Sequence, residues 1–115
     1  MVEVITTDEF VTWYETLGEN DTKAVVRVVD LLAARGVSLP FPYSSEIKGS
    51  DYALRELRVQ SGGKPLRILY AFDPLRQAVL LLGADKTGMS DKEFYATYVP
   101  QAEDLWEEYL RETRS

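Results

Sequence analysis

The apolar residues near the N-terminus repeat with helical spacing after one short extended segment. Residues 2–5 have the composition of a strand, and Thr6 with Glu9 matches a capping box at a helix start. The following apolar residues recur three and four apart on one helix face, and Gly18 ends the helix: Phe10, Trp13, Tyr14 and Leu17. A second helix, capped by Asn20, runs to Arg35-Gly36, and the short turn between them favours an antiparallel helical pair.

The centre of the chain alternates between turn signals and β-type segments. Residues 37–51 contain Pro40, Pro42 and several serines, and are predicted to be a connecting loop. Three strands follow at 54–60, 66–73 and 78–84, and the first two are joined by a two-residue Gly62-Gly63 turn. The last two strands are apolar on both faces, so we expect them in the middle of the sheet.

The C-terminal segment predicts one long helical stretch over 91–111. Ser90 and Glu93 form a capping box, and Pro100 either kinks the stretch or splits it. Its apolar stripe either packs on the protein's own sheet or fills a groove of a partner. The predicted fold class is α+β, a single domain over 1–115. Two N-terminal helices pack on a mainly antiparallel four-stranded sheet, followed by a C-terminal helix, and the second sheet face stays partly open.

The composition narrows the possible chemistry. The 115 residues are 45% hydrophobic and include no cysteine and no histidine, which excludes disulfides, a Ser–His triad and a His-built zinc site. There is no run of eighteen apolar residues, so we expect no membrane span. The acidic N-terminus lacks a signal-peptide pattern, which favours a cytoplasmic location.

The charge is unevenly distributed, although the net charge is −6. Residues 1–47 carry three basic and eight acidic groups, and residues 89–115 carry three and seven. Residues 48–88 instead carry seven basic and four acidic groups. The chain therefore has a basic centre between acidic flanks, unless this is a chance arrangement in a short sequence.

The Gly-Gly turn fixes which residues face each other across the predicted hairpin. With Gly62 and Gly63 at the centre of the turn, Arg67 lies opposite Arg58, so both guanidinium groups project from one face. Their repulsion can be relieved by Glu56 on the same face, by splaying into water, or by a bound anion. Paired guanidinium groups suit phosphate because each offers a planar fork of donors.

Other residues can join this arginine pair at one end of the sheet. Lys64 lies in the turn, although a solvated turn lysine is the simpler interpretation, and Lys86 lies in the loop after the third strand. Tyr95 begins the last helix and is either near Lys86 or part of the core. The remaining basic residues of the centre are further RNA-binding candidates: Lys48, Arg55 and Arg76.

Such a basic face suggests metal-independent cleavage of RNA. Arginine and lysine can stabilise the charge of a pentavalent phosphate, and RNA supplies its own 2′-hydroxyl as nucleophile, so neither a metal nor a cofactor is needed. The proton acceptor stays open between Glu56, Tyr95 and a lysine of lowered pKa.

Four consecutive stretches resemble a known protein family: LRELRV at 54–59, the glycine turn, LRILYAF at 66–72 and VLLLGADKTG at 79–88. Together they resemble the core of the RelE/HigB toxin superfamily, and most closely the phage-derived Gp49-like branch of the HigB toxins. The prolines at 40 and 42 and the helical tail over 94–110 also fit, so the resemblance covers nearly the whole chain.

The resemblance implies a RelE-like toxin of a type II toxin–antitoxin system that enters the ribosomal A site, cuts messenger RNA and inhibits translation. It implies no cofactor, and as partner a small helix-turn-helix antitoxin (HigA-like) through which operator DNA is bound. Arg67 matches the transition-state phosphate contact, and Arg58, Lys64 and Lys86 match further basic positions. Tyr95 matches an aromatic residue that stacks on a base in some members.

The chain departs from the family pattern in three respects. It is acidic overall, only Lys86 follows the last strand where paired lysines are usual, and histidine is missing. Few phosphate contacts predict weak, salt-sensitive binding. Two alternatives stay open: a ParE-like toxin that inhibits gyrase, and a non-catalytic module that only binds a partner.

Overall fold

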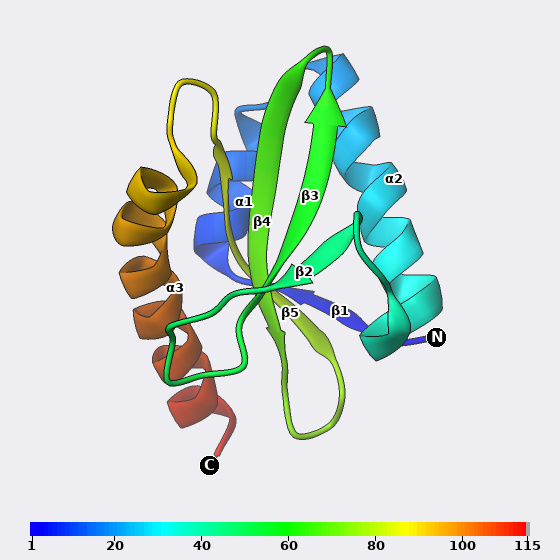
Figure 1. Ribbon diagram of the computed structural model, residues 1–115. Helices are drawn as coiled ribbons and strands as arrows, with labels where there is room; N and C mark the ends of the chain where they lie inside the picture. The colour runs from blue at the N-terminus through cyan, green and yellow to red at the C-terminus, as the bar shows by residue number, and fades with distance from the viewer. Residues whose placement is uncertain (115) are drawn as a thin grey trace.

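The computed structural model describes residues 1–114 and is built around one five-stranded sheet (Figure 1). The strands are β1 (Val4–Thr6), β2 (Ser44–Glu46), β3 (Arg55–Ser61), β4 (Lys64–Phe72) and β5 (Ala78–Asp85). The helices are α1 (Asp8–Glu15), α2 (Glu19–Arg35), the 3₁₀ turn η1 (Gly36–Ser38) and α3 (Asp91–Thr113). The predicted α+β class with a helical pair, a sheet and a C-terminal helix is confirmed.

The sheet has the order β1-β5-β4-β3-β2. β1 joins the edge parallel to β5, as expected, and all other neighbours are antiparallel. The hairpin of β3 and β4 has the predicted register, with Ser61 opposite Lys64 and Arg58 opposite Arg67. This register follows from the Gly62-Gly63 turn, in which both glycines have positive φ, a conformation that other residues rarely adopt.

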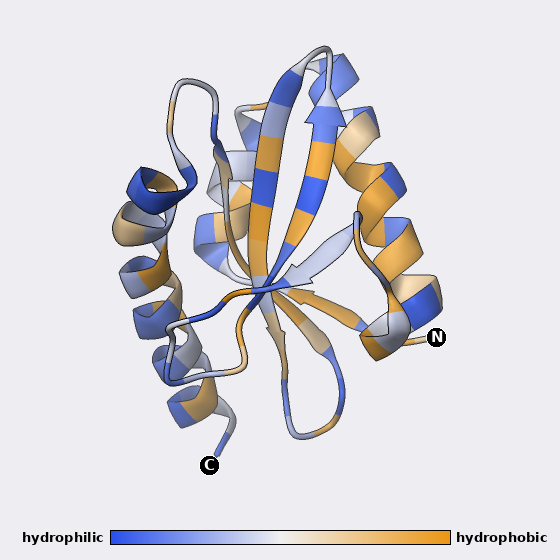
Figure 2. Ribbon diagram, viewed as in Figure 1, coloured by the Kyte–Doolittle hydropathy of each residue, from blue (hydrophilic) through white to orange (hydrophobic). Residues whose placement is uncertain are grey.

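Helices cover both faces of the sheet, and each face has its own core (Figure 1). Hydrophobic and polar residues alternate along β3 and β4 (Figure 2), so one face of the hairpin packs under α1 and α2. That core contains Phe10, Val25, Leu32, Leu57, Ile68 and Tyr70. The opposite core lies beside α3 and contains Leu69, Leu81, Phe94, Ala102 and Trp106.

The boundaries of the first two helices differ from the prediction. Thr7, not Thr6, caps α1: its hydroxyl accepts a hydrogen bond from the Phe10 N–H at 3.0 Å. Thr6 instead belongs to β1 and pairs with Leu80 of β5, because the parallel strand runs one residue further than its apolar pattern indicates. Gly18 is the residue before α2 and Asn20 lies inside that helix, so α1 ends earlier and α2 begins earlier than expected.

The sheet has five strands rather than the four expected. The additional strand, β2, lies in the segment predicted as loop and pairs with β3 through Ser44 opposite Leu57. Its sequence, Ser-Ser-Glu, has no apolar alternation and gives no strand signal. A polar contact holds it instead: the buried Ser44 hydroxyl lies 2.6 Å from the hydroxyl of Tyr70.

α3 is one continuous helix that contains Pro100 and begins at the predicted capping box of Ser90 and Glu93. Ala102 and Trp106 are buried in the core beside the sheet, so the apolar stripe packs on the protein's own strands. Within residues 1–114, no helix combines the length and the apolar character that a bilayer crossing requires.

Candidate functional site

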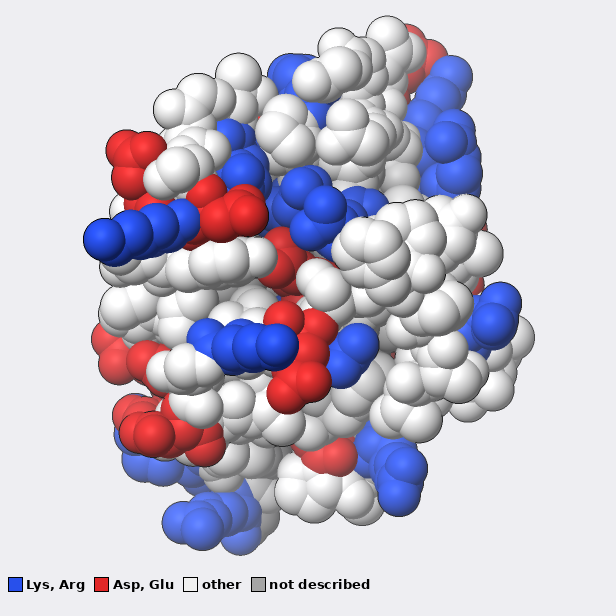
Figure 3. Space-filling view, in the orientation of Figure 1, with Lys and Arg blue, Asp and Glu red and all other residues white. Residues whose placement is uncertain are grey.

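Arg58 and Arg67 lie directly opposite each other on β3 and β4, on the face of the sheet that α3 shares. This side follows from the pleat, because Leu69 and Ala71 lie two and four residues after Arg67 on the same face of β4 and belong to the core beside α3. Basic atoms gather over β3 and β4 in the middle of the visible surface, with acidic atoms beside them (Figure 3). The predicted placement of the two arginines opposite each other on one face is therefore present.

The two arginines differ in exposure. Arg67 is only 6% exposed, whereas Arg58 is half-buried. The expectation that both guanidinium groups lie on an open sheet face is wrong for Arg67. The reason is that α3 comes close on this side. Tyr95, in the second turn of α3, donates a hydrogen bond to Glu56, which contacts Arg67.

Glu56 is the buried partner of Arg67. Its carboxylate is 1% exposed, and Oε1 lies 3.3 Å from the Arg67 Nε without the geometry of a hydrogen bond. Oε2 accepts a hydrogen bond from the Tyr95 hydroxyl, and Arg67 Nη1 donates to the carbonyl oxygen of Leu66 at 3.0 Å. One carboxylate oxygen and one guanidinium nitrogen are thus left buried without a hydrogen bond, which is costly unless another group completes the site.

The repulsion between the arginines is relieved in one predicted way, by Glu56, and in one that was not predicted, a contact with an aromatic ring. Arg67 contacts Glu56, and Arg58 leans the other way, with its Cζ 5.3 Å from the ring centroid of Phe41. Burial, followed by the charge of Arg58, lowers the pKa of Arg67, and the carboxylate of Glu56 opposes this shift. The cluster therefore keeps an excess of positive potential that an anion would relieve.

Tyr95 is a hydrogen-bond donor in this cluster. Burial and the hydrogen bond to Glu56 raise the pKa of Tyr95 well above its ordinary value of 10.0. Its phenol donates to the carboxylate of Glu56, and both the hydrogen bond and the raised pKa favour Glu56 over Tyr95 as the proton acceptor.

Lys86 borders the same cluster. Its backbone N–H donates to the carbonyl oxygen of Pro65 at 2.8 Å, which fastens the loop after β5 to the hairpin. Its Nζ lies 2.8 Å from Asp91 Oδ1 at the start of α3. The hydrogen bond and charge of Lys86 lower the pKa of Asp91, and Arg58 and Arg67 add to this effect, so all four groups share one electrostatic environment.

Four further basic candidates lie away from the arginine pair. Lys64 turns to the α2 side, where its Nζ lies 2.5 Å from Asp21 Oδ2, so it does not join the cluster. Arg55 is paired with the core residue Tyr70 and donates from Nε to the Ser44 hydroxyl at 3.1 Å. Lys48 and Arg76 are exposed in the loops after β2 and β4.

A cavity of about 450 Å³ gives access to both arginines. It lies between α2, the segment before β2 and the outer part of β3, and its lining includes Arg27, Pro42, Tyr43, Arg58, Gln60 and Arg67. Sequence reasoning missed Phe41 and Tyr43, which are 68% and 43% exposed beside this opening. The available signal was two aromatic residues within a segment predicted to be an exposed loop.

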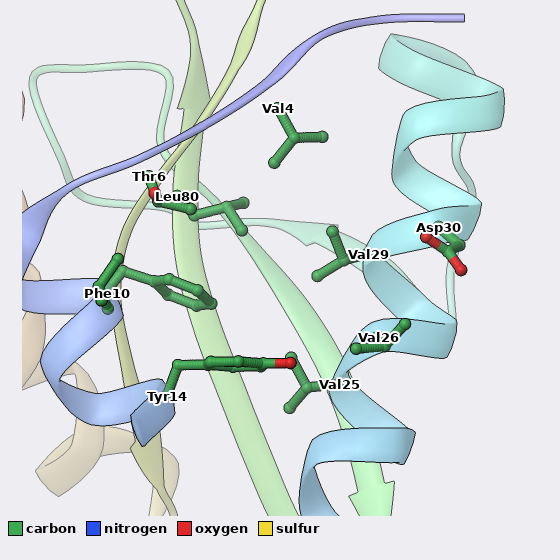
Figure 4. Close-up of a pocket in the computed structure, with 10 residues that line it drawn as sticks. Val4, Thr6, Phe10, Tyr14, Val25, Val26, Val29, Asp30 and Leu80 are labelled. Carbon is green, nitrogen blue, oxygen red and sulfur yellow. The ribbon is translucent and has the colours of Figure 1, made fainter. Parts of the chain in front are cut away.

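A second cavity, of about 350 Å³, lies on the other side of the sheet between α1 and α2 (Figure 4). Phe10, Tyr14 and Val25 point into it, and apolar side chains form most of its wall, so it lacks the paired charges of the arginine site. Across residues 1–114, no group of three or more carboxylates is arranged to hold a metal ion.

Comparison with known proteins assigns the chain to a family. The family model described as "Phage derived protein Gp49-like (DUF891)" matches residues 12–107, which include the whole β3–β4 hairpin and the loop of Lys86. The chain belongs to this Gp49-like family, within the RelE/HigB toxin superfamily.

Two relatives of the chain carry toxin names. A protein of Mycobacterium tuberculosis (strain ATCC 25618 / H37Rv) named "Putative toxin HigB3" is 37% identical over 99 residues, or 85% of this chain and 84% of that protein. A second protein of the same strain, "Putative toxin HigB2", is 31% identical over 100 residues, which span 85% of this chain and 49% of its longer sequence.

A solved structure confirms the fold. The "archaeal RelE-RelB complex from Pyrococcus horikoshii OT3" contains a chain that matches with a TM-score of 0.56 at 15% identity, covering 76% of this chain and 97% of that one. At this identity the match establishes the RelE-like architecture alone.

Proposed function

We propose that the protein is the toxin of a type II toxin–antitoxin system and a ribosome-dependent endoribonuclease that cuts messenger RNA and inhibits translation. The observation that carries the proposal is the cross-strand pair of Arg58 and Arg67 at the mouth of one cavity. Like charges directly opposite each other on neighbouring strands are unfavourable by themselves, and a phosphodiester fits the planar donors of both groups.

In the proposed reaction the 2′-hydroxyl of the RNA attacks the adjacent phosphorus. The new bond joins the 2′-oxygen to phosphorus, and the bond between phosphorus and the 5′-oxygen breaks, which leaves a 2′,3′-cyclic phosphate and a 5′-hydroxyl. Arg67 and Arg58 stabilise the negative charge that develops on the pentavalent phosphorus. The scheme requires no metal or cofactor, because the nucleophile belongs to the substrate.

The protons are handled by the groups behind the arginines. The nucleophile's proton passes to Oε1 of Glu56, the carboxylate oxygen without a hydrogen bond, as Arg67 turns toward the phosphate. Tyr95 donates to Oε2 and keeps the carboxylate oriented, and the departing 5′-oxygen takes up a proton from water. Lys86 contributes positive potential at the border of the site while it is held by Asp91.

The test is cleavage of a message on purified programmed ribosomes. Arg58→Ala is the most informative variant, because Arg58 is half-buried and its truncation relieves repulsion instead of leaving a buried carboxylate unpaired. Loss of one charge-stabilising group is expected to slow cleavage by about 10²- to 10³-fold. Arg111→Ala is the matched control, since Arg111 is an exposed arginine near the far end of α3, about 30 Å along the helix from Asp91.

The result also separates the alternatives. Wild-type protein that leaves the message intact but inhibits DNA supercoiling by gyrase would replace this proposal by the ParE-like function. Cleavage by Arg58→Ala at the wild-type rate would remove the arginine pair from the mechanism.

We also propose a small helix-turn-helix antitoxin (HigA-like) as partner, with operator DNA bound through that antitoxin. Two observations support this: two relatives carry toxin names, and the structural neighbour was solved as a RelE-RelB complex. Because the proposed substrate is messenger RNA on translating ribosomes, we place the protein in the cytoplasm. Co-expression with the adjacent reading frame should yield a stable complex that Arg58→Ala preserves, and failure of the two chains to co-purify would contradict this partner.

A further inference from the structure

Phe41 and Tyr43 expose aromatic surface at the entrance to the arginine site. They are 68% and 43% exposed and stand on either side of Pro42, in the segment between η1 and β2. Most large apolar residues of the chain are buried, so two open aromatic side chains within three positions need an explanation.

The segment that carries these rings is held firmly in place. The backbone N–H groups of Tyr43 and Ser44 both donate to the carbonyl oxygen of Pro40, at 3.0 and 3.1 Å. The carbonyl oxygen of Tyr43 accepts from the N–H of Arg58 at 2.9 Å, which ties the segment to β3 beside the arginine pair. The backbone that carries the rings is therefore fixed relative to β3, and binding on the rings requires little ordering of the chain.

The rings and the cations form one continuous surface. Arg58 lies over the Phe41 ring, while Pro42 and Tyr43 line the cavity that also contains Arg67. Arg27 of α2 and Gln60 of β3 complete this wall with a further cation and an amide. A backbone phosphate held by the arginines would place the neighbouring nucleotide next to exposed aromatic faces.

We propose that Phe41 and Tyr43 form a stacking site for an unpaired nucleobase next to the cleaved phosphodiester. The occupant is single-stranded RNA, because its recognition combines cationic groups for the phosphates with aromatic faces for the bases, and both occur here side by side. An acidic peptide would explain the arginines but not the paired rings. This inference rests on the proposed function and states how the same site binds a base of its RNA substrate.

The experiment uses ribosomes programmed with a message that carries 2-aminopurine at each A-site codon position in turn, with 2′-O-methyl groups that block cleavage. Stacking of 2-aminopurine quenches its fluorescence, so wild-type protein should quench at one position. Phe41→Ala and Tyr43→Ala should each weaken binding roughly 5- to 150-fold, the range for loss of one base–aromatic stack. Phe41→Trp should retain quenching, whereas Phe41→Leu, which keeps an apolar side chain without a ring, should lose it.

Leu75→Ala is the matched control, because Leu75 is 79% exposed in the loop between β4 and β5, at the end of the sheet away from the arginines (Figure 1). It should bind and quench like wild type. All five substitutions lie on exposed side chains, and thermal melting verifies that each variant is folded.

Three results would overturn the inference while the proposed nuclease stands. These are wild-type binding by both alanine variants, equal quenching by Phe41→Leu and wild type, and unchanged RNA affinity with loss of antitoxin binding, which would assign the rings to a protein interface. Failure of the wild-type protein to cut an unmodified message on the same ribosomes would instead remove the proposed function itself.

Discussion

The buried pair of Glu56 and Arg67 allows its structural and catalytic contributions to be separated by substitution. Arg67→Met leaves the carboxylate of Glu56 buried, with the Tyr95 hydroxyl as its recorded hydrogen-bond donor. Glu56→Gln leaves the guanidinium of Arg67 opposite Arg58 without the carboxylate it contacts. The double variant is neutral at both positions, and its glutamine still offers an acceptor to Tyr95.

The magnitudes follow from the burial of the pair, whose side chains are 7% and 1% exposed. Removing one partner of a buried ion pair costs about 3–5 kcal/mol, because the remaining charge stays buried without compensation. For a domain of this size that corresponds to a fall in Tm of roughly 10–20 °C. The double variant should lie within about 1 kcal/mol of the wild type, since a neutral pair carries no such penalty. The coupling energy should therefore be at least about 5 kcal/mol, because the two single losses are almost entirely absent from the double variant.

The assay is urea unfolding followed by the fluorescence of Trp13 and Trp106, combined with cleavage on programmed ribosomes. The double variant should unfold like the wild type and cut no message, which would show that the loss of activity is chemical. The control cycle is Lys23→Met with Glu19→Gln, an exposed pair at 3.2 Å whose side chains are 70% and 82% exposed. Exposed pairs of this kind couple by about 0.3–0.5 kcal/mol.

Two results would refute this reasoning. A coupling energy for the buried pair no larger than that of the control pair would show that its charges are solvated. Cleavage by the folded double variant would show that neither group takes part in the reaction.

Other predictions concern the core and the titrating groups. Gly83→Ala would place a Cβ 2.2 Å from Cε3 of Trp13, and the resulting shift of α1 should destabilise the protein by about 1–3 kcal/mol in urea unfolding. Burial disfavours the charge of Asp73, but hydrogen bonds from Gln77 and Tyr109 outweigh this and lower its pKa. The stabilisation from the Asp73 carboxylate is thus complete above its ordinary pKa of 3.8 and is lost as the pH falls through the lower pKa of the folded state. Between about pH 5 and 2, the free energy of unfolding should therefore fall less steeply for Asp73→Asn than for wild type. Tyr95→Phe should slow cleavage and destabilise the protein by about 1–3 kcal/mol, and the wild-type rate should show no ionisation of Tyr95 below pH 10.0.

The pairing of the arginines could be predicted from the sequence because it depends on local rules. A two-residue glycine turn sets the register of the hairpin, and the register decides that Arg58 and Arg67 share a face. The position of Glu56 on the same face follows from the same pleat, because Glu56 lies two residues before Arg58 on β3. The whole inner part of the cluster is therefore encoded within one hairpin.

The remaining parts of the site depend on contacts between distant segments, which the periodicity of apolar residues in the sequence does not predict. The burial of Arg67 is set by α3, since Tyr95 reaches Glu56 across 39 positions in the chain. The position of Phe41 beside Arg58 depends on β2, a strand held by a buried Ser44–Tyr70 contact and not by apolar alternation. Lys64 belongs to the predicted hairpin, but the pleat of β4 places it on the face of Leu66 and Ile68, where it contacts Asp21 of α2.

The acidic character of the chain is compatible with a site for phosphate. The carboxylates of α3 from Glu103 onward begin about 12 Å along the helix from Tyr95, which contacts the cluster through Glu56, and this exceeds the Debye length of about 8 Å at physiological ionic strength. They are therefore largely screened from the arginine pair. Within the site, Asp91 is matched by Lys86 and Glu56 by Arg67, so the charge of Arg58 is left in excess. The net charge of −6 opposes non-specific attraction to nucleic acid, while the local balance favours a phosphodiester presented at one place. Such a distribution suits a protein whose RNA is delivered by the ribosome rather than captured from solution.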